Sequence, residues 1–278
     1  MKCHDSGPMQ LHRAIYKSCN TYFANTYKLI IDKHGPKKGV NVWANHLKSF
    51  GLGNFMGYDL PAGRKGHIPT SDYYDKWYPN GGWRSTTIIS NSIGQGEVNM
   101  TPIQLANMMA AVANRGHYYT PHIIKKIKGQ EIDKKFTTKH ETTIDKKHFD
   151  PVINGLVDVY NSGTASQYKL NDVEIAGKTG TAENFTKING KRVQLTDHSV
   201  FVAFAPKDNP KIALAVLVEN GYWGTRYGAP IATLMIEKYI RGSRDSIKRK
   251  DLEKRMFESS LDFEYQKPIS GQPFTINR

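Results

Sequence analysis

The residues best suited to chemistry in this sequence lie in IAGKTGTAENF, residues 175–185, where a strand-like run ends in a lysine, two threonines and a glycine. Lys178 and the hydroxyls of Thr179 and Thr181 suit a carboxylate ligand, and an exposed strand edge can bind a peptide as an added strand. Gly180 carries no side chain that would block that edge. Taken alone, K-T-G-T has a second interpretation, a turn that carries a surface lysine.

A second polar motif, Ser18-Cys19-Asn20, lies far upstream at a predicted junction between two helices. S-x-x-K, S-x-N and K-T-G together are the three motifs of serine enzymes that form an acyl-serine with penicillins. Two of the three therefore occur in this chain.

Five segments, in the family's order, resemble the transpeptidase domain of class B penicillin-binding proteins, and most of all the penicillin-binding protein 2 group, the elongation enzymes of rod-shaped bacteria. The resemblance implies an α/β fold of the α+β type. This is an antiparallel β-sheet flanked by helices, with a helical subdomain, as in serine β-lactamases. The segments are MQLHRAIYKSCNTYF, SIGQGEVNMTPIQLANMMAAVANRG, NSGTAS, AGKTGTAEN and DHSVFVAFAPKDNPKIALAVLVENG.

The resemblance implies a D,D-transpeptidase that crosslinks peptidoglycan without a cofactor. Such an enzyme attacks the carbonyl between two D-alanines, forms an acyl-serine and passes the acyl group to an amine of a neighbouring stem peptide. The implied catalytic residues are Ser18, which relays a proton to the leaving amine, Asn20, whose amide holds the substrate backbone, and Lys178. The implied substrate-binding residues are Thr179, Gly180 and Thr181, with the Thr181 N–H in the oxyanion hole.

The nucleophile is the element that this chain is expected to lack. The only S-x-x-K is Ser166-Gln167-Tyr168-Lys169, which follows S-x-N, whereas the family places its nucleophile before S-x-N. Ser166 is therefore not expected to be the nucleophile. We expect an N-terminally truncated chain, inactive alone, from a longer protein whose domain faces the periplasm on a bacterial inner-membrane anchor.

Composition is that of a globular chain, with 38% hydrophobic and 11% aromatic residues in 278 positions. The formal charge of +14 raises the possibility of nucleic-acid binding, but the lysines are spread along the chain. A solvated surface that favours an anionic lipid or polymer is the preferred interpretation. The sequence predicts a partial transpeptidase domain at residues 1–242 and a charged C-terminal tail at residues 243–278, and two cysteines provide no disulfide framework.

Periodicity and capping signals predict the elements that must position these motifs. Residues 57–92 are expected to form an irregular, aromatic-rich excursion. The runs VEIAG, SVFVAFAP and KIALAVLVEN are expected to be neighbouring antiparallel strands. Helices are expected at residues 10–33 with a break at 17–20, at 40–50, at 102–114, at 151–162 and at 229–241.

Other candidate residues have structural interpretations beside functional ones. Cys3, His4, Asp5 and His12 are metal-ligand types, but their spacing matches no zinc motif, so no metal is expected. His198 is expected to be structural. Trp223 and Tyr227 either border the substrate cleft or pack in the core.

Two other functions remain open from the sequence. A serine β-lactamase or D,D-carboxypeptidase shares the motifs, although the E-x-x-L-N segment of class A lactamases is absent. A non-catalytic peptidoglycan-binding or scaffold domain would lack the serine altogether. By resemblance, the expected partners are peptidoglycan stem peptides, β-lactams, a lipid II polymerase of the SEDS type and the elongation machinery, and no nucleic acid.

Overall fold

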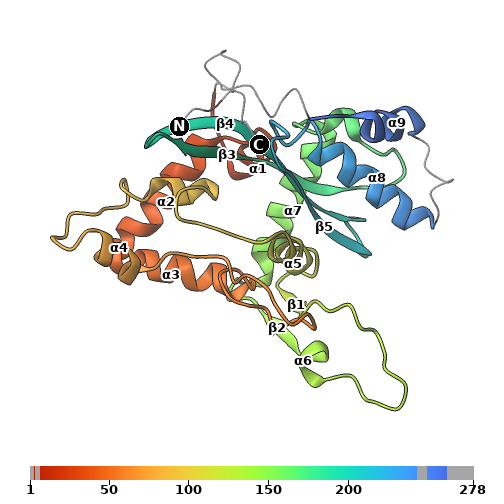
Figure 1. Ribbon diagram of the computed structural model, residues 1–278, viewed down its shortest axis with the longest axis horizontal. Coiled ribbons are helices and arrows are strands. Elements are labelled where there is room, and N and C mark those ends of the chain that lie inside the picture. The colour runs from red at the N-terminus through yellow and green to blue at the C-terminus, as the bar shows by residue number, and fades with distance from the viewer. Residues whose placement is uncertain (1–2, 4–6, 243–248, 262–278) are drawn as a thin grey trace. The chain divides into compact units, whose positions relative to one another are not determined.

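The computed structural model describes residues 3, 7–242 and 249–261, and the chain divides into two compact units, Met1–Gly155 and Leu156–Arg278, each described by itself. Figure 1 labels their elements. The first unit contains α1 (Leu11–Tyr16), α2 (Asn20–His34), α3 (Pro36–Ser49), α4 (Ser71–Trp77), η1 (Ile89–Ile93), α5 (Pro102–Ala113), β1 (His117–Tyr119), α6 (Lys134–Thr137), β2 (Lys139–Glu141) and η2 (Lys146–His148). The helix α7 (Phe149–Asn161) contains the boundary, and the second unit continues with η3 (Ser166–Tyr168), β3 (Ala176–Ile188), β4 (Lys191–Ala205), β5 (Ile212–Val218), α8 (Gly228–Arg241) and α9 (Lys250–Glu258).

In the first unit, helices α2 and α3 pack against each other. The predicted break before α2 is confirmed, because α1 ends at Tyr16 and α2 begins at Asn20. A side chain at Gly39 would collide with the backbone of Ile31, so this glycine allows the two helices to pack closely. Tyr27, Ile31 and Val40 of this pair lie in one buried cluster with side chains from the aromatic-rich excursion.

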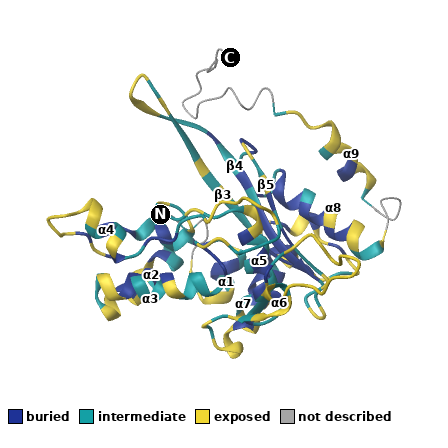
Figure 2. Cartoon of the chain, turned by 60° about the horizontal axis from the view of Figure 1, so that its bottom comes forward, coloured by how far each residue is buried: buried dark blue, intermediate teal, exposed yellow. Residues whose placement is uncertain are grey.

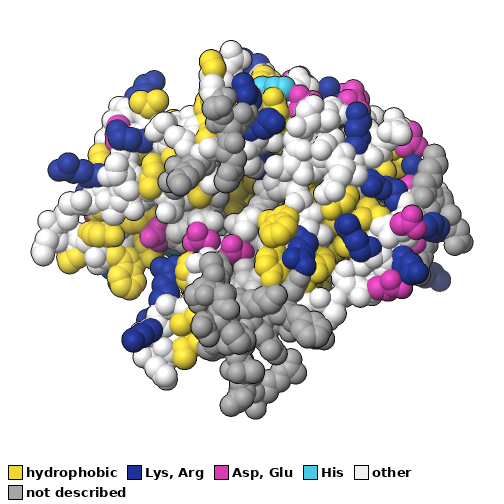
Figure 3. Space-filling model, turned by 90° about the horizontal axis from the view of Figure 1, so that it is seen from above, with side chains coloured by type: hydrophobic (Ala, Val, Ile, Leu, Met, Phe, Trp, Pro, Cys, Tyr) yellow, Lys and Arg dark blue, Asp and Glu magenta, His cyan; other side chains and the backbone are white. Residues whose placement is uncertain are grey.

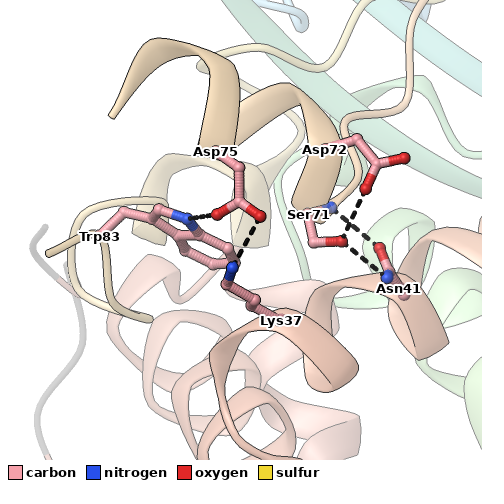
Figure 4. Close-up of polar contacts among 6 residues, drawn as sticks. All are labelled: Lys37, Asn41, Ser71, Asp72, Asp75 and Trp83. Carbon is pink, nitrogen blue, oxygen red and sulfur yellow. Dashed lines mark hydrogen bonds and ion pairs between the residues drawn. The ribbon is translucent and has the colours of Figure 1, made fainter. Parts of the chain in front are cut away.

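The aromatic-rich excursion docks on α3 through α4, which the sequence did not predict as a helix (Figure 4). Asn41 of α3 accepts a hydrogen bond from the Ser71 N–H at 2.9 Å and donates one to the Ser71 hydroxyl at 2.8 Å. It thereby satisfies a backbone donor in the first turn of α4, where helices have unpaired N–H groups. Lys37 lies 2.8 Å from Asp75, which also accepts from the Trp83 indole at 2.9 Å. These two hydrogen bonds lower the pKa of Asp75, with Lys37 the larger cause.

The helix predicted at residues 102–114 is confirmed as α5. Thr101 and Gln104 form a capping box, and Pro102 is the first helical residue. The buried Gln104 amide also donates to the carbonyls of Asn54 at 2.9 Å and Lys65 at 3.0 Å. One side chain therefore caps α5 and holds both sides of the connection between α3 and α4.

The second unit is built on the predicted antiparallel sheet, in which the strand order is β3-β4-β5. The register places Lys178 opposite Val202, Thr179 opposite Phe201 and Gly180 opposite Val200. Helix α8 packs against β4 and β5, and Figure 2 shows dark-blue buried residues where the helix covers the sheet. Phe201 and Phe204 are completely buried in this core.

The β3–β4 hairpin is much longer than the predicted strands. The two strands continue past β5 to a turn at Asn189 and Gly190, both with positive φ. The register shifts between Ala182 and Asn184, which marks a bulge where the hairpin leaves the three-stranded sheet. Figure 2 shows the outer part of the hairpin as exposed or half-buried ribbon, which explains why its sequence lacks the apolar pattern of a core strand.

Part of the charged C-terminal region packs on the second unit. In α9, Leu252 is buried, and the Arg255 guanidinium donates to the Tyr168 hydroxyl at 3.2 Å. Residues 243–248 and 262–278 of this region lie outside the described residues.

Basic side chains are dispersed on the face shown in Figure 3, among acidic and uncharged residues. This distribution fits the spread of lysines along the sequence and gives no single basic groove on that face. In the part of the chain that the structure describes, every helix is too short or too polar to span a bilayer.

Replacing Asn41 with alanine should destabilise the first unit by about 2 kcal/mol, because the N–H of the buried Ser71 would lose its acceptor. Urea unfolding of the variant measures the change. Lys37→Ala is the matched control, since it removes an exposed ion pair at the same helix–helix contact and should have a much smaller effect. Equal losses for the two variants would contradict the capping role of Asn41.

Candidate active site

Ser18 lies two residues after the end of α1, in the left-handed conformation with a φ of 53°. Its N–H donates to the Ile15 carbonyl at 3.2 Å, and the Cys19 N–H donates to the Ala14 carbonyl at 3.0 Å. These are the paired bonds of a Schellman cap, whose left-handed position is usually a glycine because a Cβ there costs about 1 kcal/mol. A non-glycine residue held in this conformation is a backbone feature that occurs often at functional sites.

The other residues of S-x-N are fixed by the start of α2 and by a disulfide. Asn20 is the first residue of α2, and the buried Cys19 is bonded to Cys3. The sequence predicted no disulfide framework from two cysteines. The structure nevertheless joins them in one disulfide, which the sequence did not predict. Spacing alone carries no information on pairing, since the bond depends on how the segment before α1 returns to the end of that helix.

The disulfide also removes the Cys3 thiol from the metal-ligand set considered above. His4 and Asp5 lie outside the described residues. Within the described ranges, no three His, Cys, Asp or Glu side chains are grouped closely enough to hold a metal ion.

Lys178 is a half-buried lysine on β3. Its Nζ donates to the Thr179 carbonyl at 3.1 Å and to the Thr179 hydroxyl at 3.4 Å. Burial disfavours the ammonium form and lowers the pKa of Lys178 to about 8. The amine therefore exchanges its proton close to neutral pH, and a lysine with so perturbed a pKa is a candidate for a functional site.

Thr179, Gly180 and Thr181 follow Lys178 along an edge strand. Among the described residues, β3 has a partner strand on one side only, so its other edge can receive an extended peptide. Thr181 is exposed and Thr179 half-buried. The Thr179 hydroxyl lies 3.2 Å from the hydroxyl of Thr164, which comes from the turn after α7.

The loop between β5 and α8 lies directly against this strand. A side chain on Gly224 would collide with the Gly180 backbone, so the loop reaches the K-T-G segment only because residue 224 is a glycine. The completely buried Ser199 holds the loop by donating to the Trp223 carbonyl at 2.9 Å and accepting from the Gly228 N–H at 3.1 Å. The loop therefore packs against the backbone of β3 at Gly180.

Two aromatic residues and His198 also have defined places at this loop. The Asn220 N–H donates to His198 Nδ1 at 3.0 Å, so His198 anchors the loop, as expected of a structural histidine. Tyr227 is buried and packs, whereas Trp223 is 54% exposed. Of these two rings, only that of Trp223 is available to a ligand.

Ser166 and Lys169, the only S-x-x-K pair, lie on the single turn η3 and just after it. Both side chains are exposed, and no buried helix holds them. This surface turn lacks the fixed geometry that an activated serine needs.

The structure groups the predicted residues into two sets. Lys178, Thr179, Gly180 and Thr181 lie together in the second unit, whereas Ser18 and Asn20 belong to the first unit. Sequence reasoning missed two supporting residues, Thr164 and Ser199. NSGTAS marked the segment of Thr164 without a role for it, and no local pattern distinguishes a buried serine such as Ser199.

Comparison with known proteins identifies the family of the chain. Residues 2–237 match the family described as the penicillin binding protein transpeptidase domain. The chain belongs to this family. The peptidoglycan D,D-transpeptidase MrdA of Acinetobacter baumannii is 34% identical to it over 242 residues, which are 82% of this chain and 34% of the relative.

Solved structures of penicillin-binding proteins share the fold. Pseudomonas aeruginosa PBP2 in complex with WCK 5153 matches with a TM-score of 0.70 and 28% identity, over 89% of this chain and 51% of that chain. The complex between PBP2 and MreC from Helicobacter pylori matches with a TM-score of 0.67 and 26% identity, over 85% and 41% of the two chains. The predicted resemblance and fold are thus confirmed, and the chain spans about a third of the MrdA relative and about half of the Pseudomonas chain.

We expect Ser18→Gly to make the first unit more stable than Ser18→Ala by about 1 kcal/mol. Both changes remove the hydroxyl, but only glycine relieves the left-handed strain at this penicillin-binding-protein motif. Urea unfolding of the two variants side by side tests this, with the alanine variant as the matched control. Equal stability would show that residue 18 is not strained in solution.

Lys178 should lose its proton at about pH 8 in the folded chain and near 10.5 in the unfolded chain. Because the unfolded chain then keeps the proton to higher pH, the contribution of Lys178 to stability should rise with pH between about 8 and about 10.5. A ¹³Cε NMR titration of labelled lysines, with and without urea, measures both midpoints, and Lys178→Arg assigns the signal. A midpoint that is the same in both states would contradict burial as the cause.

Proposed function

We propose that the protein is a peptidoglycan D,D-transpeptidase of the penicillin-binding protein 2 group, acting through an acyl-serine and acylated by β-lactams. The observation that carries the proposal is the half-buried Lys178 beside the Thr179 hydroxyl on an edge strand, in a chain of the transpeptidase family. A serine oxygen would bond to the penultimate D-alanine carbonyl, and the terminal D-alanine would leave as an amine that takes up a proton. An amine of a second stem would then take the acyl group, lose a proton and free the serine.

The strand residues would bind the substrate and stabilise its charges. Lys178, Thr179 and Thr181 would hold the terminal carboxylate with charge-assisted hydrogen bonds. The Thr181 N–H would donate to the oxyanion, an interaction worth on the order of 3 kcal/mol. Gly180 would leave space for the acyl group.

The S-x-N residues would handle the leaving group and the peptide backbone. Ser18 would pass a proton to the departing amine, and Asn20 would bind the substrate backbone through its amide. The nucleophile would come from an S-x-x-K segment encoded before residue 1, since Ser166 follows S-x-N and lies on an exposed turn.

We place the partial transpeptidase domain at residues 1–242, close to the end of the family match at residue 237, with residues 243–278 as a C-terminal tail. The domain would face the periplasm, held at the bacterial inner membrane by a segment outside these residues. MreC, a partner of the Helicobacter pylori PBP2, supports proposing the elongation machinery as partner, including a lipid II polymerase of the SEDS type.

The full protein encoded by the gene should be labelled covalently by a fluorescent penicillin. Lys178→Ala or Ser18→Ala should slow acylation by about a hundredfold, because each removes a group expected to act on the reacting centre. Stopped-flow or gel fluorescence measures the rate. Lys187→Ala, an exposed lysine farther along the same strand, is the matched control and should be labelled normally.

Normal labelling of the Lys178 and Ser18 variants would contradict the assigned site. The 278 residues alone should remain unlabelled under the same conditions. A stable adduct on Ser166, detected by peptide mass spectrometry, would show that the surface S-x-x-K is the nucleophile.

A further inference from the structure

Thr164 is an exposed threonine that a rigid turn holds beside the K-T-G strand. After α7 ends, the Ala165 N–H donates to the Val159 carbonyl at 3.0 Å and the Ser166 N–H to the Gly163 carbonyl at 3.3 Å. These backbone bonds fix the turn without help from the Thr164 side chain. The Thr164 hydroxyl then lies 3.2 Å from the Thr179 hydroxyl, where either oxygen can donate.

The base of this turn is packed against β3 as well. A side chain at Gly177 would collide with the rings of Phe201 and Tyr160, so the end of α7 lies close to the strand. Tyr160 is buried and shares a hydrogen bond of 3.1 Å with Thr233 of α8. The distance between the Thr164 and Thr179 hydroxyls is therefore set by the core of the second unit.

The donors around Thr179 determine where its own proton can point. A threonine hydroxyl has one proton to donate and two lone pairs to accept with. Lys178 Nζ donates to one lone pair from 3.4 Å. If Thr164 donates to the other, the Thr179 proton is left for a third group.

We propose that Thr164 is a positioning residue that donates to Thr179 and thereby directs the Thr179 proton to the substrate carboxylate. This inference rests on the proposed function, because the carboxylate is that of the D-alanyl peptide or of a β-lactam. A carboxylate only accepts hydrogen bonds, so it requires a donor. Because Thr164 donates to Thr179, the Thr179 hydroxyl does not donate to Thr164 and can donate to the carboxylate. Thr164 itself touches neither the reacting carbonyl nor the leaving amine in this scheme.

The test compares Thr164→Val, which keeps the shape and removes the hydroxyl, with Thr164→Ser, which keeps the hydroxyl. In the full protein encoded by the gene, the acylation rate constant is measured for a penicillin and for its methyl ester, which lacks the carboxylate charge. The rate constant for the penicillin divided by that for its methyl ester should fall about tenfold in Thr164→Val. This is the effect expected when a hydrogen bond to a charged group is lost. Thr164→Ser should restore the ratio.

The ratio separates positioning from a structural effect. A fold defect would slow the acid and the ester alike, so an unchanged ratio in Thr164→Val, or a loss that serine fails to restore, would overturn the inference. Thr164→Ala repeats the measurement if the valine variant melts at a lower temperature. Absence of acylation in the unmodified protein would instead overturn the proposed function, so the two failures are distinguishable.

Discussion

The close packing of two glycines, Gly224 and Gly180, is the constraint on which the second unit depends. Their backbones approach so closely that no side chain fits on residue 224. The loop between β5 and α8 can therefore lie against the K-T-G strand. The completely buried Ser199 holds this loop through hydrogen bonds to Trp223 and Gly228. With α7 packed near Gly177 and the loop near Gly180, β3 is held from two directions, and among the described residues its outer edge has no partner strand.

The first unit fixes its motif by a different means. Ser18 occupies the left-handed position of a helix cap, and the following residue is tied by the Cys3–Cys19 disulfide. Loop-closure entropy makes a link across a segment of this length worth about 3 kcal/mol. That is larger than the strain of about 1 kcal/mol at one left-handed serine, so the unit can hold Ser18 in place.

The sequence predicted those features that depend on neighbouring residues. The helix that begins at Pro102 and the neighbouring antiparallel strands around K-T-G follow from local patterns, and both are confirmed. Helix α4 was missed because its apolar and aromatic residues sit among prolines and glycines, and its first turn is capped from α3 by Asn41. The outer hairpin, the disulfide and the role of Ser199 depend on contacts between distant segments, which no local sequence pattern records.

For the candidate site, the motifs named Lys178 and its neighbours. The Thr164–Thr179 contact could not be predicted in this way, because it depends on the path of the chain after α7.

Partial burial gives Lys178 two properties that oppose each other. Removal from water weakens its ammonium form, and so lowers the pKa to about 8, yet it strengthens the attraction between that ammonium and a bound carboxylate. At pH 7 roughly nine in ten molecules would carry the charge before a ligand arrives. A bound carboxylate would stabilise the charged form and raise the pKa again, so ligand and proton would bind cooperatively at this lysine. An exposed lysine, already fully charged and well hydrated, would show little of this coupling, which is a physical reason for the strand to bury it.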